Sequence, residues 1–122
     1  MRLGLKRVYE PPAADDGLRV LADRLWPRGL RKSEAHIDLW PRELAPSTDL
    51  RKWFGHDPAK WAEFQKRYKA ELDANSGAVD ELLHQLGGRH ATLLYAAHDE
   101  AHNNAVVLKD YLEKRAAKGS TA

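Results

Sequence analysis

The strongest constraint on the fold is a nearly continuous apolar run from Ala91 to Ala97, in which threonine and tyrosine accompany leucine and alanine. A strand with one face in water alternates apolar and polar residues, whereas a strand covered on both faces is apolar throughout. The run therefore predicts a strand that is buried on both faces, and the rest of the chain must supply the elements that cover it.

Three other segments have the composition of strands. Leu3 to Tyr9 is a short extended candidate and Leu18 to Leu25 is rich in valine and leucine, and each is followed closely by proline. The third, from Ile37 to Leu44, is weaker because Pro41 cannot donate a hydrogen bond to a neighbouring strand. We expect an edge strand or an irregular segment there.

Helical patterns follow these segments. Ser47 has the position of an N-cap for a helix that Gly55 ends, and Asp57-Pro58 begins a second helix. Apolar residues then repeat at helical intervals in three stretches: Trp61 to Leu72, Val79 to Leu86, and Ala105 to Leu112, the last of which belongs to a helix that frays from Ala116 onward.

These elements predict an α/β fold with a small, mostly parallel sheet of three to four strands flanked by helices. The chain has 122 residues, 43% of them hydrophobic, which suits one domain with a buried core. We therefore expect a single domain over residues 1–122, with residues 119–122 as a flexible tail.

The composition excludes several classes of function. The sequence has no cysteine, so disulfides, a thiol nucleophile and thiolate metal ligands are all ruled out. Its net charge of +2 is too small to indicate a nucleic-acid-binding protein by itself. The N-terminus lacks the apolar stretch of a signal peptide, and no apolar run approaches the length of a membrane span. We expect a soluble, cytoplasmic protein with no membrane partner.

The first candidate site follows the second predicted strand, at Arg24 to Gly29. Ligands of open α/β sheets bind beyond the carboxyl ends of the strands. Arg24 and Arg28 present guanidinium groups that suit a carboxylate or phosphate, and Gly29 allows the backbone to approach a ligand. The alternative is structural: Trp26 fills the core, and the arginines pair with acids such as Asp23.

A second candidate segment runs from Trp40 to Ser47. The free N–H groups at a helix start can receive an anion, although a serine in this position more often only caps the helix.

The third segment, His98 to Asn104, joins the buried strand to the last helix. It carries imidazole, carboxylate and amide groups, and Asp99 there can also be explained as a helix cap. His98 and His102 lack a third ligand, so no metal site is predicted.

Several long motifs resemble the domain of unknown function 488 family, in its YeaO-like branch. They are Val20 to Gly29, Trp40 to Ser47, Trp53 to Pro58, Leu93 to Ala97, and His102 to Ala105. The resemblance covers nearly the whole chain and implies a compact α/β sandwich with no assigned reaction.

The resemblance also implies where a site lies. Other branches of the family carry a cysteine at the end of the last strand and a Cys-His-Arg run at the following helix. The matching positions here are Tyr95 and His102-Asn103-Asn104, so thiol chemistry does not carry over to this chain. What carries over is the location, with the Arg24 to Gly29 segment beside the His98 to Asn104 loop.

Three hypotheses follow. In the first, the protein binds or acts on a small anionic or nucleotide-like ligand; the others are a nucleic-acid-binding module and a non-catalytic partner-binding domain. The first assigns acid/base roles to His102 and Asp99. It assigns ligand binding to Arg24, Trp26, Arg28, Gly29, Trp40, Ser47, Tyr95, His98, Asn103 and Asn104. The sequence identifies no cofactor or oligomeric state, and it leaves open whether the protein is an enzyme.

Overall fold

A computed structural model describes residues 2–120 and shows an α/β fold built on three strands. The strands are β1 (Leu3–Arg7), β2 (Leu18–Leu21) and β3 (Ala91–Tyr95). They form one parallel sheet in the order β1-β3-β2. All five residues of the central strand β3 are buried, which confirms the strand predicted from the apolar run.

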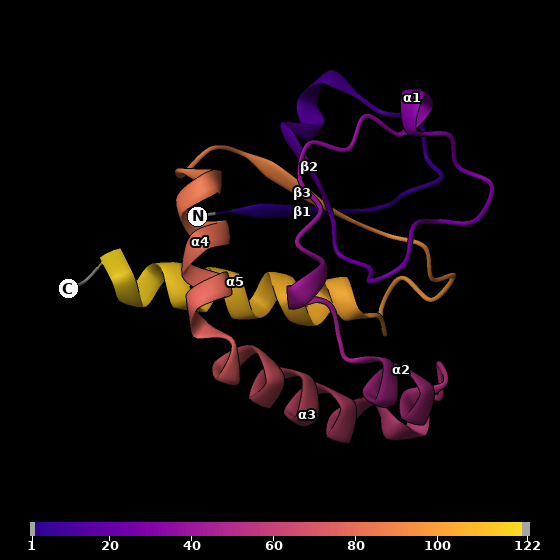
Figure 1. Cartoon of the computed structure of the whole chain (residues 1–122), viewed down its shortest axis with the longest axis vertical. Coiled ribbons are helices and arrows are strands. Elements are labelled where there is room, and N and C mark those ends of the chain that lie inside the picture. Colours follow the sequence, from indigo (N-terminus) through magenta and orange to yellow (C-terminus); the bar gives the residue numbers. More distant parts are fainter. Residues whose placement is uncertain (1, 121–122) are drawn as a thin grey trace.

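Helices make up most of the remaining chain and confirm the α/β class (Figure 1). The α-helices are α1 (Lys32–Ala35), α2 (Thr48–Phe54), α3 (Trp61–Ala74), α4 (Ser76–Leu86) and α5 (Asn104–Ser120). Three short 3-10 helices lie at Ala14–Asp16, Arg42–Leu44 and Pro58–Lys60. None of the described helices is both long and apolar enough to cross a membrane.

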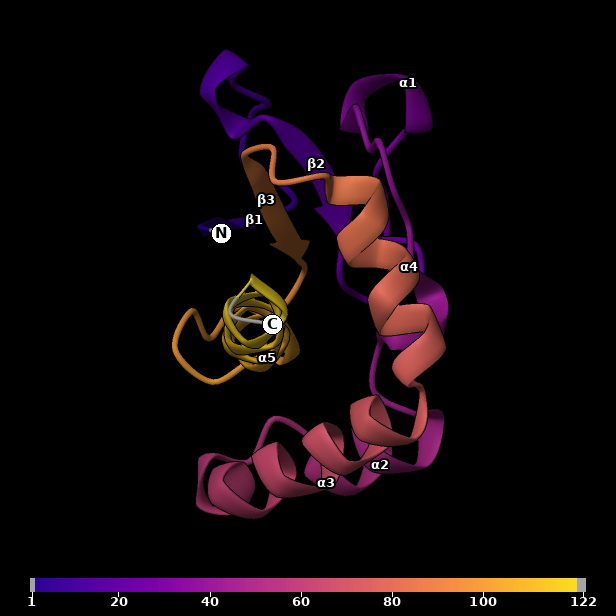
Figure 2. The same cartoon turned by 90° about the vertical axis from the view of Figure 1, so that its left-hand side faces the viewer.

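The larger core lies between the sheet and the long helices. Helix α5 contacts β1 and β3, and α3 and α4 both contact α5 (Figure 2). The apolar stripes predicted for α3 and α4 face this core through Phe64, Tyr68 and Leu72 and through Val79, Leu82 and Leu86. The Tyr68 hydroxyl donates to the Leu44 carbonyl at 2.5 Å, so α3 also holds the segment that precedes α2.

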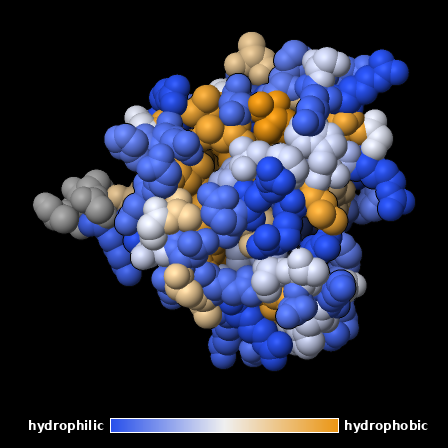
Figure 3. All heavy atoms as spheres, viewed as in Figure 1, coloured by the Kyte–Doolittle hydropathy of each residue, from blue (hydrophilic) through white to orange (hydrophobic). Residues whose placement is uncertain are grey.

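An irregular segment between β2 and α2 covers a second, smaller core around Val8, Leu21 and Leu94. The side chains packed against these three residues are Trp26, Leu30, Ile37, Trp40 and Ala96. In the space-filling view, hydrophobic residues reach the surface mainly in the upper half, where the strands and this segment lie in Figure 1 (Figure 3). The sheet is thus covered by helices on one face and largely by loop on the other.

Several sequence-based boundaries differ from the structure, and β1 ends at Arg7 instead of Tyr9. β2 ends at Leu21 instead of Leu25, and no strand spans Ile37 to Leu44. Only Leu39 bridges to Val20, because the chain turns at Pro41 into a 3-10 helix. Helix α5 continues through Ser120 instead of fraying from Ala116, and residues 121–122 of the predicted tail lie outside the described residues.

The outer edge of β1 is partly closed by carboxylates. The Leu3 N–H donates to Glu113 of α5 at 2.9 Å, and the Arg7 N–H donates to Glu10 at 3.1 Å. On the opposite edge of the sheet, the Asp38 and Leu39 N–H groups both donate to the Arg19 carbonyl of β2.

A buried ionic cluster fastens the sheet at its amino end. Arg19 is 4% exposed and Asp16 is 7% exposed, and their charged groups are 2.5 Å apart. Lys6 of β1 approaches Asp16 at 3.2 Å, and the Arg19 guanidinium also donates to the Ala35 carbonyl. Burial opposes ionisation of Asp16, but the Ala13 N–H, Lys6 and Arg19 outweigh it and lower its pKa.

We expect Asp16→Ala to lower the free energy of unfolding by about 3 kcal/mol at neutral pH, because it leaves the buried Arg19 unpaired. Urea denaturation measures this change. Because the folded-state pKa of Asp16 is lowered, its contribution is present above the unfolded value of about 3.9 and is lost as the pH falls through the folded pKa.

The matched control is Asp110→Ala, which removes a carboxylate whose side chain is 44% exposed and which pairs with Lys69 and Lys114. Such an exposed pair contributes less than about 1 kcal/mol. Equal losses in the two variants would contradict the role assigned to Asp16.

Candidate functional site

A cleft opens at the carboxyl ends of the three strands. It has a volume of about 730 Å³, within the range of about 300–1,000 Å³ usual for small-molecule sites. The lining residues come from the segments after each strand, from α2 and α3, and from the start of α5: Tyr9, Asp23, Arg24, Leu25, Trp26, Pro27, Arg28, Pro46, Arg51, Phe54, His56, Phe64, Ala96, Ala97, His98, Asp99, Asn103 and Asn104.

The two segments that the sequence singled out meet in this cleft. Arg24, Trp26 and Arg28 lie on one side, after β2, and His98 to Asn104 contributes residues after β3. Parallel strands place their carboxyl ends at the same edge of a sheet, so segments far apart in the chain become neighbours there. Helix α5 begins at the same place, with Asn104 as its first residue.

Asp23 is the most desolvated carboxylate of the cleft. The Ala96 N–H donates to its Oδ2 at 3.0 Å, and the Asn104 Nδ2 donates to its Oδ1 at 3.0 Å. Burial raises the pKa of Asp23, and these two donors, together with the charges of Arg51 and His56, only partly offset that effect. No basic side chain among residues 2–118 forms an ion pair with it.

Arg24 forms part of the cleft wall and holds the neighbouring loop. Its Nε donates to the Pro46 carbonyl at 3.1 Å and its Nη2 donates to the Ala45 carbonyl at 3.2 Å. The expected alternative, in which this arginine pairs with Asp23, is therefore wrong. The guanidinium is instead used to fix the turn that leads into α2.

Two tryptophans stiffen the wall behind Arg24. Trp26 and Trp40 meet edge to face, with ring centroids 5.4 Å apart and planes at 67°. The Trp26 Nε1 donates to the Leu30 carbonyl at 2.7 Å, and the Trp40 Nε1 donates to the Asp23 carbonyl at 2.8 Å. These bonds fix the backbone beside the Asp23 carboxylate.

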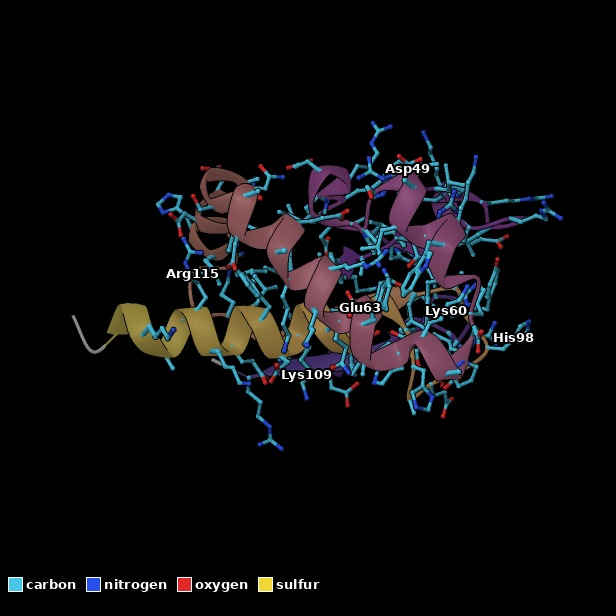
Figure 4. The ribbon with its side chains drawn as sticks, turned by 90° about the horizontal axis from the view of Figure 1, so that it is seen from below. Asp49, Lys60, Glu63, His98, Lys109 and Arg115 are labelled. Carbon is cyan, nitrogen blue, oxygen red and sulfur yellow. The ribbon has the colours of Figure 1, made fainter. Side chains whose placement is uncertain are left out.

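Two other arginines of the cleft, Arg28 and Arg51, have guanidinium groups that are available to a ligand. In the described part of the chain, the Arg28 and Arg51 guanidinium groups take part in no hydrogen bond or ion pair, and both residues are exposed. His56 and His98 add two imidazoles to the lining. His98 lies at the end of the molecule opposite Arg115 in Figure 4.

The remainder of the lining is largely apolar. Phe54 and Phe64 stack with centroids 4.2 Å apart and an interplanar angle of 22°, and Pro27 and Pro46 are buried beside the cleft. Leu25 is 57% exposed, which is unusual for a leucine beside a core. A largely apolar lining with a few polar groups is typical of sites that bind small molecules.

The loop from Asp99 to Asn103 is held mainly by its own hydrogen bonds. Asp99 accepts from the Ala101 and His102 N–H groups, both at 2.9 Å, and lies 3.0 Å from the His102 Nδ1. The Ala101 N–H is the largest cause of the lowered Asp99 pKa, with smaller contributions from His102. The Asn103 amide donates to the Asp99 carbonyl, and its oxygen accepts from the Val106 N–H inside α5. Asp99 thus caps the loop, and Asn103 caps the helix.

His102 does not line the cleft. Its ring meets Trp61 of α3 edge to face, with centroids 5.2 Å apart, and its Nδ1 faces Asp99. Residues 98–103 are not helical, so His98 and His102 do not share a helix face. His102 and Asp99, to which the sequence analysis assigns acid/base roles, are in contact, but only Asp99 lines the cleft.

Four further predicted ligand-binding residues also lie outside the lining. Gly29 is exposed with φ of 76°, and Tyr95 is buried in the core. Trp40 lies behind Trp26. Ser47 caps α2 through the Leu50 N–H at 3.1 Å, and its hydroxyl donates to Glu71 at 2.5 Å. The capping alternative for Ser47 is therefore seen directly.

Three charged lining residues were absent from the predicted site: Asp23, Arg51 and His56. Asp23 lies inside the Val20 to Gly29 motif, but the sequence indicates it only as an ion-pair partner for the neighbouring arginines. Arg51 and His56 belong to α2 and the turn after it, and nothing in their local pattern indicates that α2 packs beside the strand ends. His56 has a positive φ of 56°, which is uncommon for a residue other than glycine.

The fold and the cleft define a class of protein: a small α/β domain with a three-stranded parallel sheet and a polar cleft at the carboxyl ends of its strands. The chain belongs to the DUF488 family, since the family model described as "Inactive DUF488-N3 subclade" matches residues 2–122. The family resemblance inferred from the motifs is thereby confirmed.

Relatives from several bacteria match over almost their whole length. The chain is 41% identical over 112 residues to "Uncharacterized protein YeaO" of Escherichia coli (strain K12), which covers 92% of this chain and 97% of that protein. It is 40% identical over 114 residues to "Uncharacterized protein Rv3073c" of Mycobacterium tuberculosis and to "Uncharacterized protein Mb3100c" of Mycobacterium bovis, covering 93% of this chain and 96% of each. No solved structure matches the chain.

Because Arg24 donates hydrogen bonds to carbonyls and Arg28 does not, we expect their removal to differ in its effect on stability. Arg24→Ala removes two hydrogen bonds to carbonyls and should lower the free energy of unfolding by about 2 kcal/mol. Arg28→Ala removes no such bond and should change it by less than about 0.5 kcal/mol. Chemical denaturation of both variants checks this, and a large loss in Arg28→Ala would show that its side chain is structural.

Proposed function

We propose that this protein binds a small anionic, nucleotide-like molecule in the cleft and does not convert it. The observation that carries the proposal is the pair of exposed guanidinium groups, Arg28 and Arg51, that line the cleft and, within the described residues, make no hydrogen bond or ion pair. Guanidinium groups bind phosphate and carboxylate through paired N–H donors, and such contacts are stronger in a partly desolvated cleft.

The overall charge of the lining favours an anion. Three arginines and two histidines face two aspartates, and α5 begins at the cleft with the positive end of its dipole. The apolar walls of Phe54, Phe64 and Pro27 suit the ring of a nucleotide more than a bare inorganic ion.

Binding without turnover is supported by the position of His102. An acid/base catalyst must come within hydrogen-bond reach of the ligand, directly or through one water. The His102 ring instead packs against Trp61 outside the cleft lining. The chain also carries no cysteine, and its family model is described as an inactive subclade.

Calorimetric titration with inorganic phosphate, pyrophosphate and nucleoside monophosphates tests the proposal. Arg28→Ala and Arg51→Ala should each weaken binding about tenfold, the loss expected for one hydrogen bond to a charged group. Arg31→Ala is the matched control, since Arg31 is an exposed arginine of the same loop that does not line the cleft.

Two results would contradict the proposal. The first is equal binding by the wild type and both cleft variants. The second is recovery of the nucleotide in a chemically altered form after incubation with the protein. The nucleic-acid-binding alternative stays a prediction, and titration of a labelled oligonucleotide at low salt measures it separately.

A further inference from the structure

Anion binding leaves the Asp23 carboxylate unexplained. It lies in the cleft lining, and its negative charge would repel the anion that Arg28 and Arg51 attract. Its protein partners are the neutral Ala96 N–H and Asn104 amide, and the adjacent Arg24 donates to the Ala45 and Pro46 carbonyls and not to Asp23. Asp23 is thus a largely desolvated carboxylate that forms no ion pair with any side chain among residues 2–118.

The hydrogen bonds of Asp23 leave it with unused acceptor capacity. Each of its two oxygens accepts one protein donor, the Ala96 N–H or the Asn104 amide. A carboxylate has about four acceptor sites, so each oxygen retains room for another donor. Burial raises the pKa of this carboxylate more than the Asn104 and Ala96 hydrogen bonds and the charges of Arg51 and His56 lower it, so a further donor would stabilise the ionised form.

We infer that Asp23 selects the ligand by accepting two adjacent N–H groups from it, so that the preferred occupant is a guanine nucleotide. This inference rests on the proposed function and adds the class of ligand. The guanine ring carries an N–H and an amino group side by side, which match the two oxygens of one carboxylate. The phosphate then lies with Arg28 and Arg51, and the planar ring lies against the apolar part of the lining, to which Phe54 and Phe64 contribute.

Other ligands satisfy fewer of these groups. Adenine offers an amino group beside a bare ring nitrogen, whose lone pair would face the carboxylate. Hypoxanthine offers the ring N–H but lacks the amino group. A positively charged ligand would satisfy Asp23 but would be repelled by the two free arginines. A ligand that carries both an anionic group and paired N–H donors suits Asp23 as well as the two arginines.

Calorimetric titration of the wild type with guanosine, inosine and adenosine 5′-monophosphates tests this directly, because the three differ only in the base. We expect guanosine monophosphate to bind about tenfold more tightly than inosine monophosphate, the effect of one hydrogen bond to a charged group. Adenosine monophosphate should bind most weakly. Binding of phosphate alone is measured beside them.

Asp23→Asn should abolish the preference, because an amide presents one acceptor and one donor to the base. The matched control is Asp99→Asn, the same change at the other carboxylate of the cleft, which should keep the preference. If Asp23→Asn does not fold, the ranking of the three nucleotides by the wild type decides the inference by itself.

The outcomes separate the inference from the proposed function. Equal affinity for the three nucleotides, a preference for adenosine monophosphate, or a guanine preference that survives in Asp23→Asn overturns the role of Asp23 and leaves anion binding intact. Absence of binding by every nucleotide and by phosphate overturns both.

Discussion

The pairing of β3 with a parallel strand on each side is the interaction on which the rest of the molecule depends. A strand in this position has its backbone groups satisfied by its neighbours, and its side chains need cover on both faces. Because all three strands are parallel, their carboxyl ends open at one edge, and the residues that follow them gather there. The cleft is therefore a direct result of the direction of the strands.

The irregular segment after β2 joins this cleft to the smaller core. Trp26 lines the cleft and also packs on Val8, Leu21 and Leu94, while Trp40 supports it from behind. The hydrogen bonds of the two indoles replace the regular bonding that a helix or strand would supply. A loop wall can thus hold the backbone at Asp23 in a fixed position.

Local patterns sufficed to predict β3, the cap of α2 at Ser47 and the stripes of α3 and α4, because each depends on neighbours in the sequence. They failed where the outcome depends on distant contacts. Ile37 to Leu44 has the composition of a strand, but Pro41 and the packing of Trp40 leave a single bridge. A cleft does lie at the strand ends, where the sequence predicts the site, but Arg51 and His56 could not be predicted as part of its lining because the packing of α2 beside the sheet has no local signal.

The carboxylates at the outer edge of β1 protect this edge against pairing with a strand of another molecule. An uncovered edge strand offers N–H and C=O groups to any extended chain and is a common starting point for aggregation. Here Glu113 and Glu10 occupy the N–H groups of Leu3 and Arg7, near the two ends of a strand of only five residues. An incoming strand would have to displace both glutamates, so the edge resists intermolecular pairing without a fourth strand to close it.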